Sequence, residues 1–495
     1  MYDGQDGGQP LIIAMNVSER VRRNALYSPD AIAYASAHGE TVTYEELERT
    51  IDALARRLLT LGLRPGATAI VDVADLYRYL ALALALARIG VAHGPSMMPA
   101  AWVEAAFVDA KGVVPEGVRA VRLDALWPRS REAIGAPMPI HDEPHSVFKI
   151  CPSSGTTGES KFVPVTHELA MRRMDPRLAH DHASGNRREM TGTRQACIIK
   201  PAAAYGLLSC LLVLHGGGTV LEPSLEADEI PLWLVRSRVN RMILSPLALA
   251  KFVEVLPALR AANALEDVEV GGATLSARLL ALAQHRLAPR VSVNYGSTEC
   301  GRVAGALADV VARHPGAAGY AYPGVELRVV DEADRPLPAG TEGILAIRSP
   351  HNAERYLGSD ELSAPVFRNG WVYPGDRAVL GADGLLIIAG RVDDVINDGG
   401  EKVNPQVLEE AMMALGGVRE VAVFGVVNGV GETRVCAAIV PDVPLNANAY
   451  LARCRQHLGA RAPVFVMHME SLPRNANGKV LRTELARIAL RAAGG

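Results

Sequence analysis

A short segment rich in glycine and hydroxyl side chains, CPSSGTTGESK at residues 151–161, contains the residue types that bind phosphate. Glycine lets the backbone approach a ligand, serine and threonine hydroxyls form hydrogen bonds, and Lys161 adds a positive charge. The segment is not a Walker A loop, because Ser160 precedes the lysine and Phe162 follows it. Taken alone, it is as typical of a surface turn as of a phosphate site.

A second segment, YGSTE at 295–299, suits a nucleotide and its metal ion. Tyr295 can stack on a base, Gly296 permits close approach of the backbone, Thr298 can bond a phosphate, and Glu299 can hold a hard cation such as Mg²⁺. The same five residues are also typical of a turn that caps a helix.

Three further stretches carry charged residues in glycine-rich surroundings. In YPGDRA, Asp376 can accept both ribose hydroxyls, although aspartate after glycine is also an ordinary turn residue. GRVDDVINDGGEKVNP at 390–405 has more charge than a simple turn requires. PRNANGKVLR places Lys479 close to the C-terminus, where a lysine is by default a solvated charge.

Strands and helices must alternate to position these segments. We expect strands at 69–73, 196–199, 219–221, 241–244, 268–270 and 291–294, and helices at 43–61, 76–89, 207–214, 247–255 and 276–285. This alternation predicts an α/β fold with a parallel sheet. Ligands of such sheets bind beyond the carboxyl ends of the strands, so the turns at 151–161, 271–273 and 294–299 are candidate contacts.

The pattern changes after about residue 320. Short runs at 326–330, 343–347, 378–380 and 385–388 predict an antiparallel β subdomain, and runs at 421–427 and 434–440 predict two strands of a compact final part. We expect a domain boundary at Asp393, which separates domains 1–392 and 393–495.

Composition excludes several classes of protein. The 495 residues are 49% hydrophobic and 21% charged, which fits a globular protein with more than one domain. A net charge of -3 offers no basic surface for nucleic acid. The six cysteines include no CxxC pair, and the apolar runs are too short to span a bilayer, so we expect a cytoplasmic protein with no membrane span.

Six segments in order, SSGTTGESK, GGATLS, YGSTE, YPGD, GRVDDVINDGGEKV and PRNANGK, resemble the adenylate-forming (AMP-binding) superfamily. This superfamily includes acyl- and aryl-CoA synthetases, stand-alone adenylation enzymes and luciferases. The resemblance covers nearly the whole chain. It implies a large N-terminal domain of parallel-type α/β sheets with a small antiparallel β subdomain, followed by a small mobile α+β C-terminal domain.

The resemblance also implies a reaction in two halves. A carboxylic acid attacks the α-phosphate of ATP, with Mg²⁺ as the metal ion, and gives an acyl-adenylate and pyrophosphate. A thiol, from CoA or from the phosphopantetheine of a carrier protein, then takes the acyl group and releases AMP. The expected enzyme is therefore an ATP-dependent acid–thiol ligase.

Site residues follow from the same resemblance. Lys479, Thr298, Glu299 and Asp393 are the expected catalytic residues, with Glu299 as metal ligand and Asp393 as domain hinge. The implied nucleotide site comprises Ser153, Ser154, Gly155, Thr156, Thr157, Gly158, Lys161, Gly272, Ala273, Asn294, Tyr295, Gly296, Ser297, Asp376 and Arg391. The implied acyl pocket comprises Ala203, Ala204, Tyr205, Ser245, Gly271, Cys300 and Gly301, with Asn294 beside it. The implied thiol tunnel comprises Gly399, Gly400 and Glu401.

The segment PAAAYG at 201–206 departs from the family pattern. It lacks the usual histidine or other bulky gate residue, so we expect Tyr205 to take the place of the gate. It also lacks the aspartate that holds an α-ammonium group, which disfavours α-amino acids and leaves a β-amino or aryl amino acid open. The small apolar lining favours an aromatic or medium aliphatic acid, and we expect Gly271 to leave depth in the pocket.

Two other functions stay open from the residues. A nucleotide-binding homologue without turnover would keep the fold and bind ATP without releasing pyrophosphate. An oxygenase of the luciferase kind would consume oxygen. The sequence leaves the identity of the acid and the choice between CoA and a carrier protein undecided.

Overall fold

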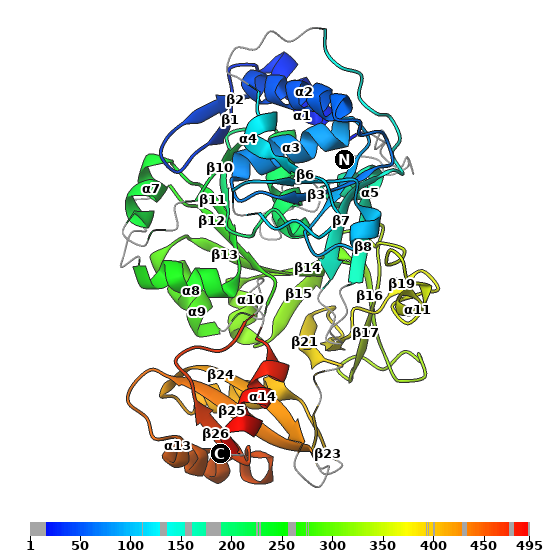
Figure 1. Cartoon of the computed structure of the whole chain (residues 1–495). Coiled ribbons are helices and arrows are strands. Elements are labelled where there is room, and N and C mark those ends of the chain that lie inside the picture. The colour runs from blue at the N-terminus through cyan, green and yellow to red at the C-terminus, as the bar shows by residue number, and fades with distance from the viewer. Residues whose placement is uncertain are drawn as a thin grey trace, which may run out of the picture. The chain divides into compact units, whose positions relative to one another are not determined.

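The computed structural model describes residues 16–110, 112–128, 136–153, 161–174, 190–223, 226, 229–255, 264–273, 275, 277–392, 394, 396–398, 401–427, 433–474 and 480–493 (Figure 1). The chain forms two compact units. The larger unit contains residues 1–313, 321–326 and 347–372, and the smaller one contains 314–320, 327–346 and 373–495.

A six-stranded sheet in the larger unit carries the hydroxyl-rich segment. Its order is β6-β5-β3-β4-β7-β8, and all neighbours are parallel except β7 and β8. The strands are β3 (Thr68–Asp72), β4 (Ala92–Gly94), β5 (Ala105–Val108), β6 (Ala120–Arg122), β7 (Val147–Ser153) and β8 (Lys161–Thr166). The segment at 151–161 therefore leaves the carboxyl end of a strand that is parallel to β4, and it returns as an antiparallel hairpin.

A second sheet of the larger unit has the order β14-β13-β12-β11-β9-β10-β1-β2. The strands from β1 to β13 along this order are parallel, whereas β2 and β14 are antiparallel to their neighbours. The strands are β1 (Ile32–Ala35), β2 (Thr41–Thr43), β9 (Arg194–Cys197), β10 (Thr219–Leu221), β11 (Arg241–Leu244), β12 (Asp267–Gly271), β13 (Arg290–Ser297) and β14 (Gly301–Leu307). The strand register places Asn294 of β13 opposite Gly271, the last residue of β12, and Ser245 follows the last residue of the neighbouring strand β11.

Helices bury the apolar surface of the larger unit. They are α1 (Glu19–Tyr27), α2 (Tyr44–Thr60), α3 (Leu76–Arg88), η1 (Ala100–Trp102), α4 (Leu123–Leu126), α5 (His167–Arg173), α6 (Ala204–His215), α7 (Ile230–Arg236), α8 (Pro246–Val255), α9 (Ala277–Arg286), α10 (Ala308–Arg313) and α11 (Asp360–Ser363). Helices α8 and α9 pack against each other and against β12 and β13 (Figure 1).

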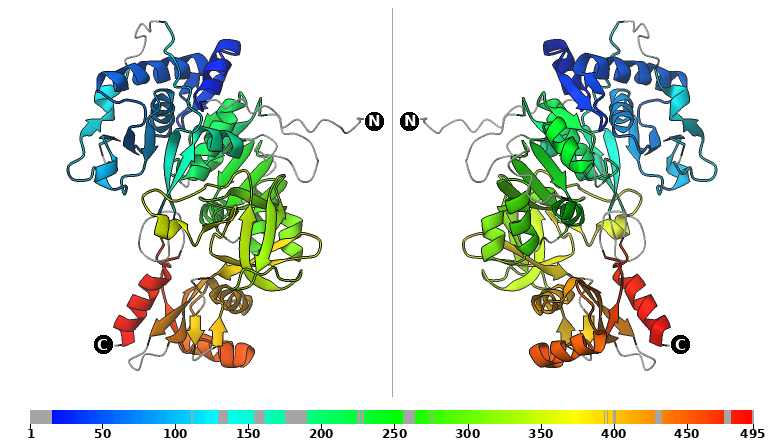
Figure 2. Two further views of the ribbon diagram at one scale, coloured as in Figure 1. Left: turned by 90° about the vertical axis from the view of Figure 1, so that its right-hand side faces the viewer. Right: turned by 90° about the vertical axis from the view of Figure 1, so that its left-hand side faces the viewer.

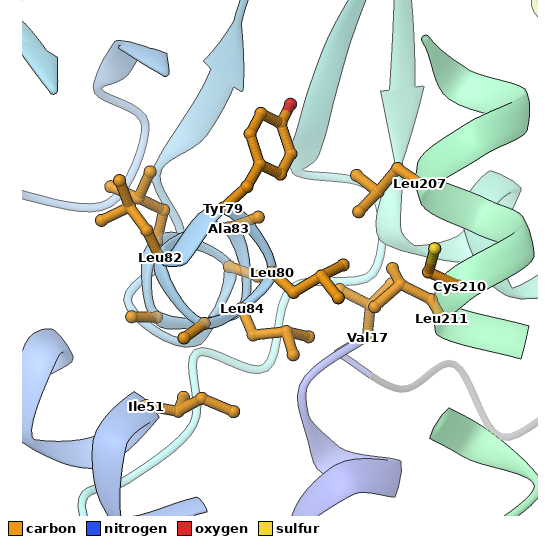
Figure 3. Close-up of a cluster of buried hydrophobic side chains, with 14 of the residues drawn as sticks. Val17, Ile51, Tyr79, Leu80, Leu82, Ala83, Leu84, Leu207, Cys210 and Leu211 are labelled. Atoms are coloured by element: carbon orange, nitrogen blue, oxygen red, sulfur yellow. The ribbon is translucent and has the colours of Figure 1, made fainter. Parts of the chain in front are cut away.

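Helix α3 lies at the centre of the largest hydrophobic core. Its sequence, LYRYLALALALAR, is apolar on almost every face, and 11 of its 13 residues are buried. Leu80 projects toward Val17 and toward Leu211 of α6, while Ile51 of α2 lies on another side of the helix (Figure 3). Such all-round apolarity is typical of a helix buried inside a globular protein.

The smaller unit is built mainly from antiparallel strands and a terminal α+β part. Strand β17 (Glu342–Arg348) pairs with β20 (Asp376–Leu380), which pairs with β21 (Leu386–Arg391), which pairs with β15 (Ala317–Ala321). Strands β18 (Phe367–Arg368) and β19 (Trp371–Val372) belong to the larger unit and pair with each other. The remaining strands are β16 (Glu326–Val330), β22 (Ile396–Asp398), β23 (Glu401–Val403), β24 (Val418–Val427), β25 (Thr433–Pro441) and β26 (Phe465–His468). The helices are α12 (Pro405–Ala414), α13 (Ala447–Leu458), η4 (Gly459–Arg461) and α14 (Arg482–Ala493).

The sheet β24-β25-β26 is covered on both faces. Val423 and Ile439 pack with residues of α12 and α13, whereas Phe424 and Ala438 pack with residues of α14. Figure 2 shows α14 (red) and α13 (orange) on opposite sides of these strands. Successive residues of a strand point to opposite faces, so this alternation gives each face its own core.

The predicted α/β fold, with a large N-terminal domain and a small C-terminal one, is confirmed. Strands and helices occur at each segment for which the sequence predicted them, from β3 to β25. The smaller compact unit includes residues 373–392, and the domain boundary at Asp393 stays a prediction. In the part of the chain that the structure describes, no helix combines the length and apolarity that crossing a bilayer requires.

Candidate active site

The two ends of the hydroxyl-rich loop are fixed by strand pairing. Ser153, the last residue of β7, pairs with Lys161, the first residue of β8. The Lys161 Nζ lies 5.4 Å from the centre of the Tyr356 ring, close enough for a cation–π contact. Residues 154–160, which include the predicted contacts Ser154, Gly155, Thr156, Thr157 and Gly158, lie outside the described residues.

Glu299 is a carboxylate bonded to Ser153, the residue at which this loop begins. It lies at the turn between β13 and β14 and is only 5% exposed. Its Oε1 accepts hydrogen bonds from the Ser153 hydroxyl at 2.5 Å and from the Tyr356 hydroxyl at 2.7 Å. Burial and the neighbouring Glu299 carboxylate raise the pKa of Tyr356, which keeps this phenol protonated as a donor.

Arg173, at the end of α5, holds the backbone of the same turn. Its Nη2 donates to the Glu299 carbonyl at 2.9 Å, and its Nε donates to the His351 carbonyl at 2.9 Å. The side chain is buried, and burial lowers its pKa. A Cβ on Gly301 would come within 3.1 Å of the Arg173 Nε, so glycine leaves room for the guanidinium.

Gly296 has a steric role in the turn. An added Cβ would lie 2.1 Å from the Gly301 carbonyl oxygen, because the register of β13 and β14 shifts between Tyr295 and Gly296. The opposite strand of the turn therefore approaches this glycine closely, and the predicted approach of Gly296 to a nucleotide stays a prediction. Ser297 belongs to the turn as well, and its Oγ accepts from the Cys300 N–H at 3.2 Å.

The donor set around Glu299 suits one particular kind of metal site. Within the described ranges, no three His, Cys, Asp or Glu side chains form a cluster that could hold an ion. A single carboxylate bonded to Ser153 instead fits Mg²⁺, which is commonly bound through one or two carboxylates together with substrate phosphates. The residues present therefore fit a magnesium ion that arrives with a phosphate chain.

The predicted acyl-pocket residues come from four elements. Ala203 caps α6, and Ala204 and Tyr205 are its first two residues. Ser245 begins the turn into α8, where its Oγ accepts from the Ala248 N–H at 3.3 Å. Gly271 ends β12, and its neighbours Gly272 and Ala273 are exposed beyond the strand. Cys300 is fully buried.

Behind these residues lies a buried ionic cluster that sequence reasoning missed. The Glu269 carboxylate receives hydrogen bonds from Arg241 at 2.8 Å and from Arg302 at 2.5 Å. Arg241 also donates to Asp267 at 3.3 Å and to Gln195 at 2.9 Å. Charged residues alternate with valine in DVEVG at 267–271, around the strand predicted at 268–270, and this alternation is the signal that could have found the cluster.

The two predicted ribose contacts form a pair in the smaller unit. Asp376 of β20 lies opposite Arg391 of β21, and Arg391 Nη1 donates to Asp376 Oδ1 at 2.9 Å and to the Pro374 carbonyl at 2.6 Å. Asp376 is thus the first residue of a strand. Its carboxylate is 13% exposed.

Several predicted residues cannot be placed. Asp393, Gly399, Gly400 and Lys479 lie outside the described residues. Glu401 begins β23, and the structure describes its backbone only. Arg173 and Tyr356, which contact Glu299, were absent from the sequence prediction because neither lies in a recognisable motif.

The chain belongs to the AMP-binding enzyme family. This family matches residues 21–357, and the C-terminal domain of AMP-binding enzymes matches residues 407–479. Membership confirms the resemblance to the adenylate-forming superfamily and the expectation of an enzyme of this class.

Several relatives match almost end to end. A feruloyl-CoA synthase of Amycolatopsis sp. is 28% identical over 489 residues, covering 94% of this chain and 97% of that protein. A medium-chain fatty-acid–CoA ligase of Escherichia coli (strain K12) is 26% identical, covering 95% of this chain and 90% of that protein.

Solved structures share the fold. The o-succinylbenzoate CoA synthetase MenE of Bacillus subtilis, solved with ATP and a magnesium ion, has a TM-score of 0.82 at 21% identity, covering 94% of this chain and 98% of that chain. The amide bond synthetase McbA of Marinactinospora thermotolerans has a TM-score of 0.81 at 24% identity, covering 96% and 99%.

Proposed function

We propose that the chain is an ATP-dependent acid–thiol ligase. In the first half of the reaction a carboxylic acid attacks the α-phosphate of ATP and releases pyrophosphate, and in the second half a thiol takes the acyl group and releases AMP. Membership of the AMP-binding enzyme family and full-length similarity to CoA ligases support this proposal.

The observation that carries the proposal is the hydrogen bond between Glu299 and Ser153, the residue at which the loop begins. Its Oε1 accepts from the hydroxyls of Ser153 and Tyr356, and neither of these two bonds uses Oε2. Glu299 would hold Mg²⁺ there, with Ser153 and Lys161 at the two ends of the loop that receives the β- and γ-phosphates. The metal ion, when bound, would neutralise phosphate charge.

Charge is the physical difficulty of the first half, because one anion attacks another. Thr298 would donate a hydrogen bond to the α-phosphate. Lys479 would lie between the carboxylate of the acid and the α-phosphate, where negative charge gathers as the new bond forms. Holding both partners in line also removes much of the entropic cost of their encounter.

Nucleoside contacts would fix the direction of the phosphate chain. Gly272, Ala273 and Tyr295 would enclose the adenine, since the first two are exposed beyond the end of β12 and the tyrosine ring offers a stacking face. Asp376 would accept the ribose hydroxyls, and Arg391, which donates to its carboxylate, would orient it.

The second half requires a path for the thiol to the place that Lys479 occupied. We propose that residues 393–495 turn about Asp393 after adenylation, which removes Lys479 and brings Gly399, Gly400 and Glu401 beside the thiol. Rotation about a short hinge is a common way to assemble two active sites in sequence.

For the substrates, the proposal is an aromatic or medium aliphatic acid and CoA. Relatives named for feruloyl-CoA, for indoleacetate and for medium-chain fatty acids support this range of acids, and all three are named for CoA as acceptor. A carrier protein with phosphopantetheine remains the second acceptor to test.

ATP–pyrophosphate exchange tests the first half. A panel of aryl, fatty, β-amino and α-amino acids would be run with the wild type and with Lys479→Ala. Exchange with one class of acid, lost in the variant, is the expected result. Tight ATP binding without exchange for any acid would contradict the proposal and favour a nucleotide-binding homologue.

Thioester formation tests the second half. The best acid would be supplied with CoA or with a phosphopantetheinylated carrier protein, using wild type and Asp393→Pro. We expect Asp393→Pro to keep adenylate formation and to lose most thioester formation. Equal loss of both steps would remove Asp393 from the role of hinge.

A further inference from the structure

Two cations, Arg173 and Lys149, are buried in the larger unit and are called the buried cation pair below. Arg173 is 6% exposed and Lys149 is 1% exposed. Arg173 donates to the carbonyls of Glu299 and His351, and the Lys149 Nζ donates to the Tyr79 hydroxyl at 3.0 Å. Among the residues that the structure describes, neither cation forms an ion pair with a carboxylate. A buried charge held only by uncharged groups destabilises a fold, so its benefit must be sought elsewhere.

Strand β7 connects Lys149 to the turn that contains Glu299. The pairing of β7 with β8 is regular from Lys149 to Ser153. Lys149, Cys151 and Ser153 therefore lie on one face of the strand, because successive residues point to opposite faces. At about 3.3 Å per residue, the backbones of Lys149 and Ser153 are about 13 Å apart. Ser153 in turn donates to the Glu299 carboxylate.

The buried Cys151 thiol lies within the field of both cations. Burial raises the pKa of Cys151, whereas Lys149 and Arg173 both act to lower it. Burial also lowers the pKa of Arg173, but a guanidinium stays charged in proteins. Arg173 bonds to the backbone carbonyl of Glu299 at 2.9 Å, while the carboxylate of this residue accepts from hydroxyl groups. The charge of Arg173 is therefore next to the turn and is not directly paired with its carboxylate.

Positive charge gathers at this end of β7. Lys161, which pairs with Ser153 in the hairpin, adds a third cation to Arg173 and Lys149. A Mg²⁺ ion on Glu299 would compensate the negative charge of that carboxylate. The positive charges of the protein would then act on phosphate groups, and solvent screens buried charges much less than exposed ones.

We infer that the buried cation pair supplies a fixed positive potential at the end of β7, which selects ATP over adenosine ligands with fewer phosphates. This inference rests on the proposed function, because it takes Ser153, Lys161 and Glu299 to lie beside the phosphate chain of ATP. It adds two specificity-determining residues, Arg173 and Lys149, that belong to none of the six motifs. Charges fixed in a medium of low dielectric constant attract an anionic ligand without first having to be ordered.

Calorimetric titration with ATP, AMP and adenosine tests this inference, once with Mg²⁺ and once with EDTA in its place. The proteins are the wild type, Lys149→Met, Arg173→Gln and Arg173→Lys. Arg172→Gln is the matched control, because Arg172 is the preceding residue of the same helix, is 41% exposed and pairs with Glu168. The measured quantity is the factor by which the Kd of each ligand rises in a variant. Damage to the part of the site that binds adenosine would raise this factor for all three ligands alike.

Lys149→Met should raise the Kd of ATP about tenfold and leave that of adenosine within about twofold. The reason is that a unit charge about 12 Å from another changes binding about tenfold at an effective dielectric constant of about 20. The same variant should raise the urea midpoint, since it removes a buried charge that has no counter-charge. Arg173→Gln should weaken ATP in the same way, whereas Arg173→Lys, which keeps the charge and changes the shape, should stay within about threefold of the wild type.

Unchanged ATP affinity in Lys149→Met, or an equal loss for ATP and adenosine, would overturn the inference and leave the proposed function standing. If Arg173→Gln does not fold, Lys149→Met decides alone, because this side chain touches neither Ser153 nor the Glu299 turn. No binding of ATP by the wild type in either buffer would contradict the proposed function, and the inference would fall with it.

Discussion

Ser153 and Glu299 are 146 residues apart in the chain, and their side chains are joined by a hydrogen bond of 2.5 Å. Ser153 ends a strand of one sheet, and Glu299 follows a strand of the other. The bond therefore ties the hydroxyl-rich loop to the turn after β13. Tyr356, from a third part of the chain, donates to the same carboxylate oxygen.

Glu299→Gln should lower the rate of adenylation about 100-fold or more and raise the Mg²⁺ concentration needed for half-maximal rate. Removal of one electrostatic contact to the reacting groups typically costs this much. Pyrophosphate exchange measured against Mg²⁺ concentration gives both numbers. The matched control is Tyr356→Phe, which removes one hydrogen bond from Glu299 and keeps its carboxylate. An unchanged Mg²⁺ dependence in Glu299→Gln would exclude this residue as the metal ligand.

Asp376→Ala should abolish discrimination between ATP and 2′-deoxy-ATP. If the carboxylate accepts the ribose hydroxyls, the wild type prefers ATP by about tenfold in kcat/KM, because a hydrogen bond to a charged group is worth about this much. Loss of the acceptor removes this preference. Asp383→Ala is the control, because Asp383 caps the next turn by accepting from the Leu385 N–H. A preference for ATP that survives in Asp376→Ala would place the ribose elsewhere.

Gly296→Ala should destabilise the larger unit by about 3 kcal/mol, at the upper end of the usual cost of overpacking. The added Cβ would collide with the Gly301 carbonyl, and neither group is a flexible side chain. Gly39→Ala is the matched control: Gly39 has a φ of +94° and nothing within 4 Å of an added Cβ, so only backbone strain of about 1 kcal/mol applies. Urea unfolding measures both. Equal costs in the two variants would show that β14 can move away from Gly296.

Stability should fall as the pH drops from about 6.5 to about 4. His167 accepts a hydrogen bond from the Val17 N–H, and His215 Nε2 donates to the Val17 carbonyl. Burial lowers the pKa of His167 and of His215 to about 4. Because the unfolded chain binds these protons more readily, each histidine should cost about 2 kcal/mol of stability at pH 5 relative to pH 7.

Urea midpoints at pH 7 and pH 5 check this expectation. His167→Asn and His215→Asn should each reduce the loss between the two pH values, whereas replacement of the exposed His457 should leave it unchanged. Both histidines bond to Val17, which lies against Leu211 of α6 (Figure 3), so acid should first loosen the packing at Val17. A loss of the same size in both histidine variants and in the wild type would assign the acid sensitivity to other groups.

The sequence by itself determined the elements and the family. The periodic spacing of apolar residues and the glycine-rich turns were enough to predict β3, α3, β12 and the later strands, because this spacing is a local property of the chain. The order of six motifs was enough to name the superfamily. Glu299 and the hydroxyl-rich loop could be selected from the sequence for the same reason, since each belongs to a contiguous segment.

Only the tertiary structure decided what surrounds those segments. Arg173 and Tyr356 reach Glu299 from distant parts of the chain, and Glu269 finds Arg302 across the strands of a sheet. Tyr205 fills the volume over Gly271 because α6 begins beside the end of β12. The packing around a residue and its hydrogen-bond partners depend on which elements become neighbours in the fold. The sequence alone therefore does not show whether a ligand or an aromatic ring occupies the space beside a glycine.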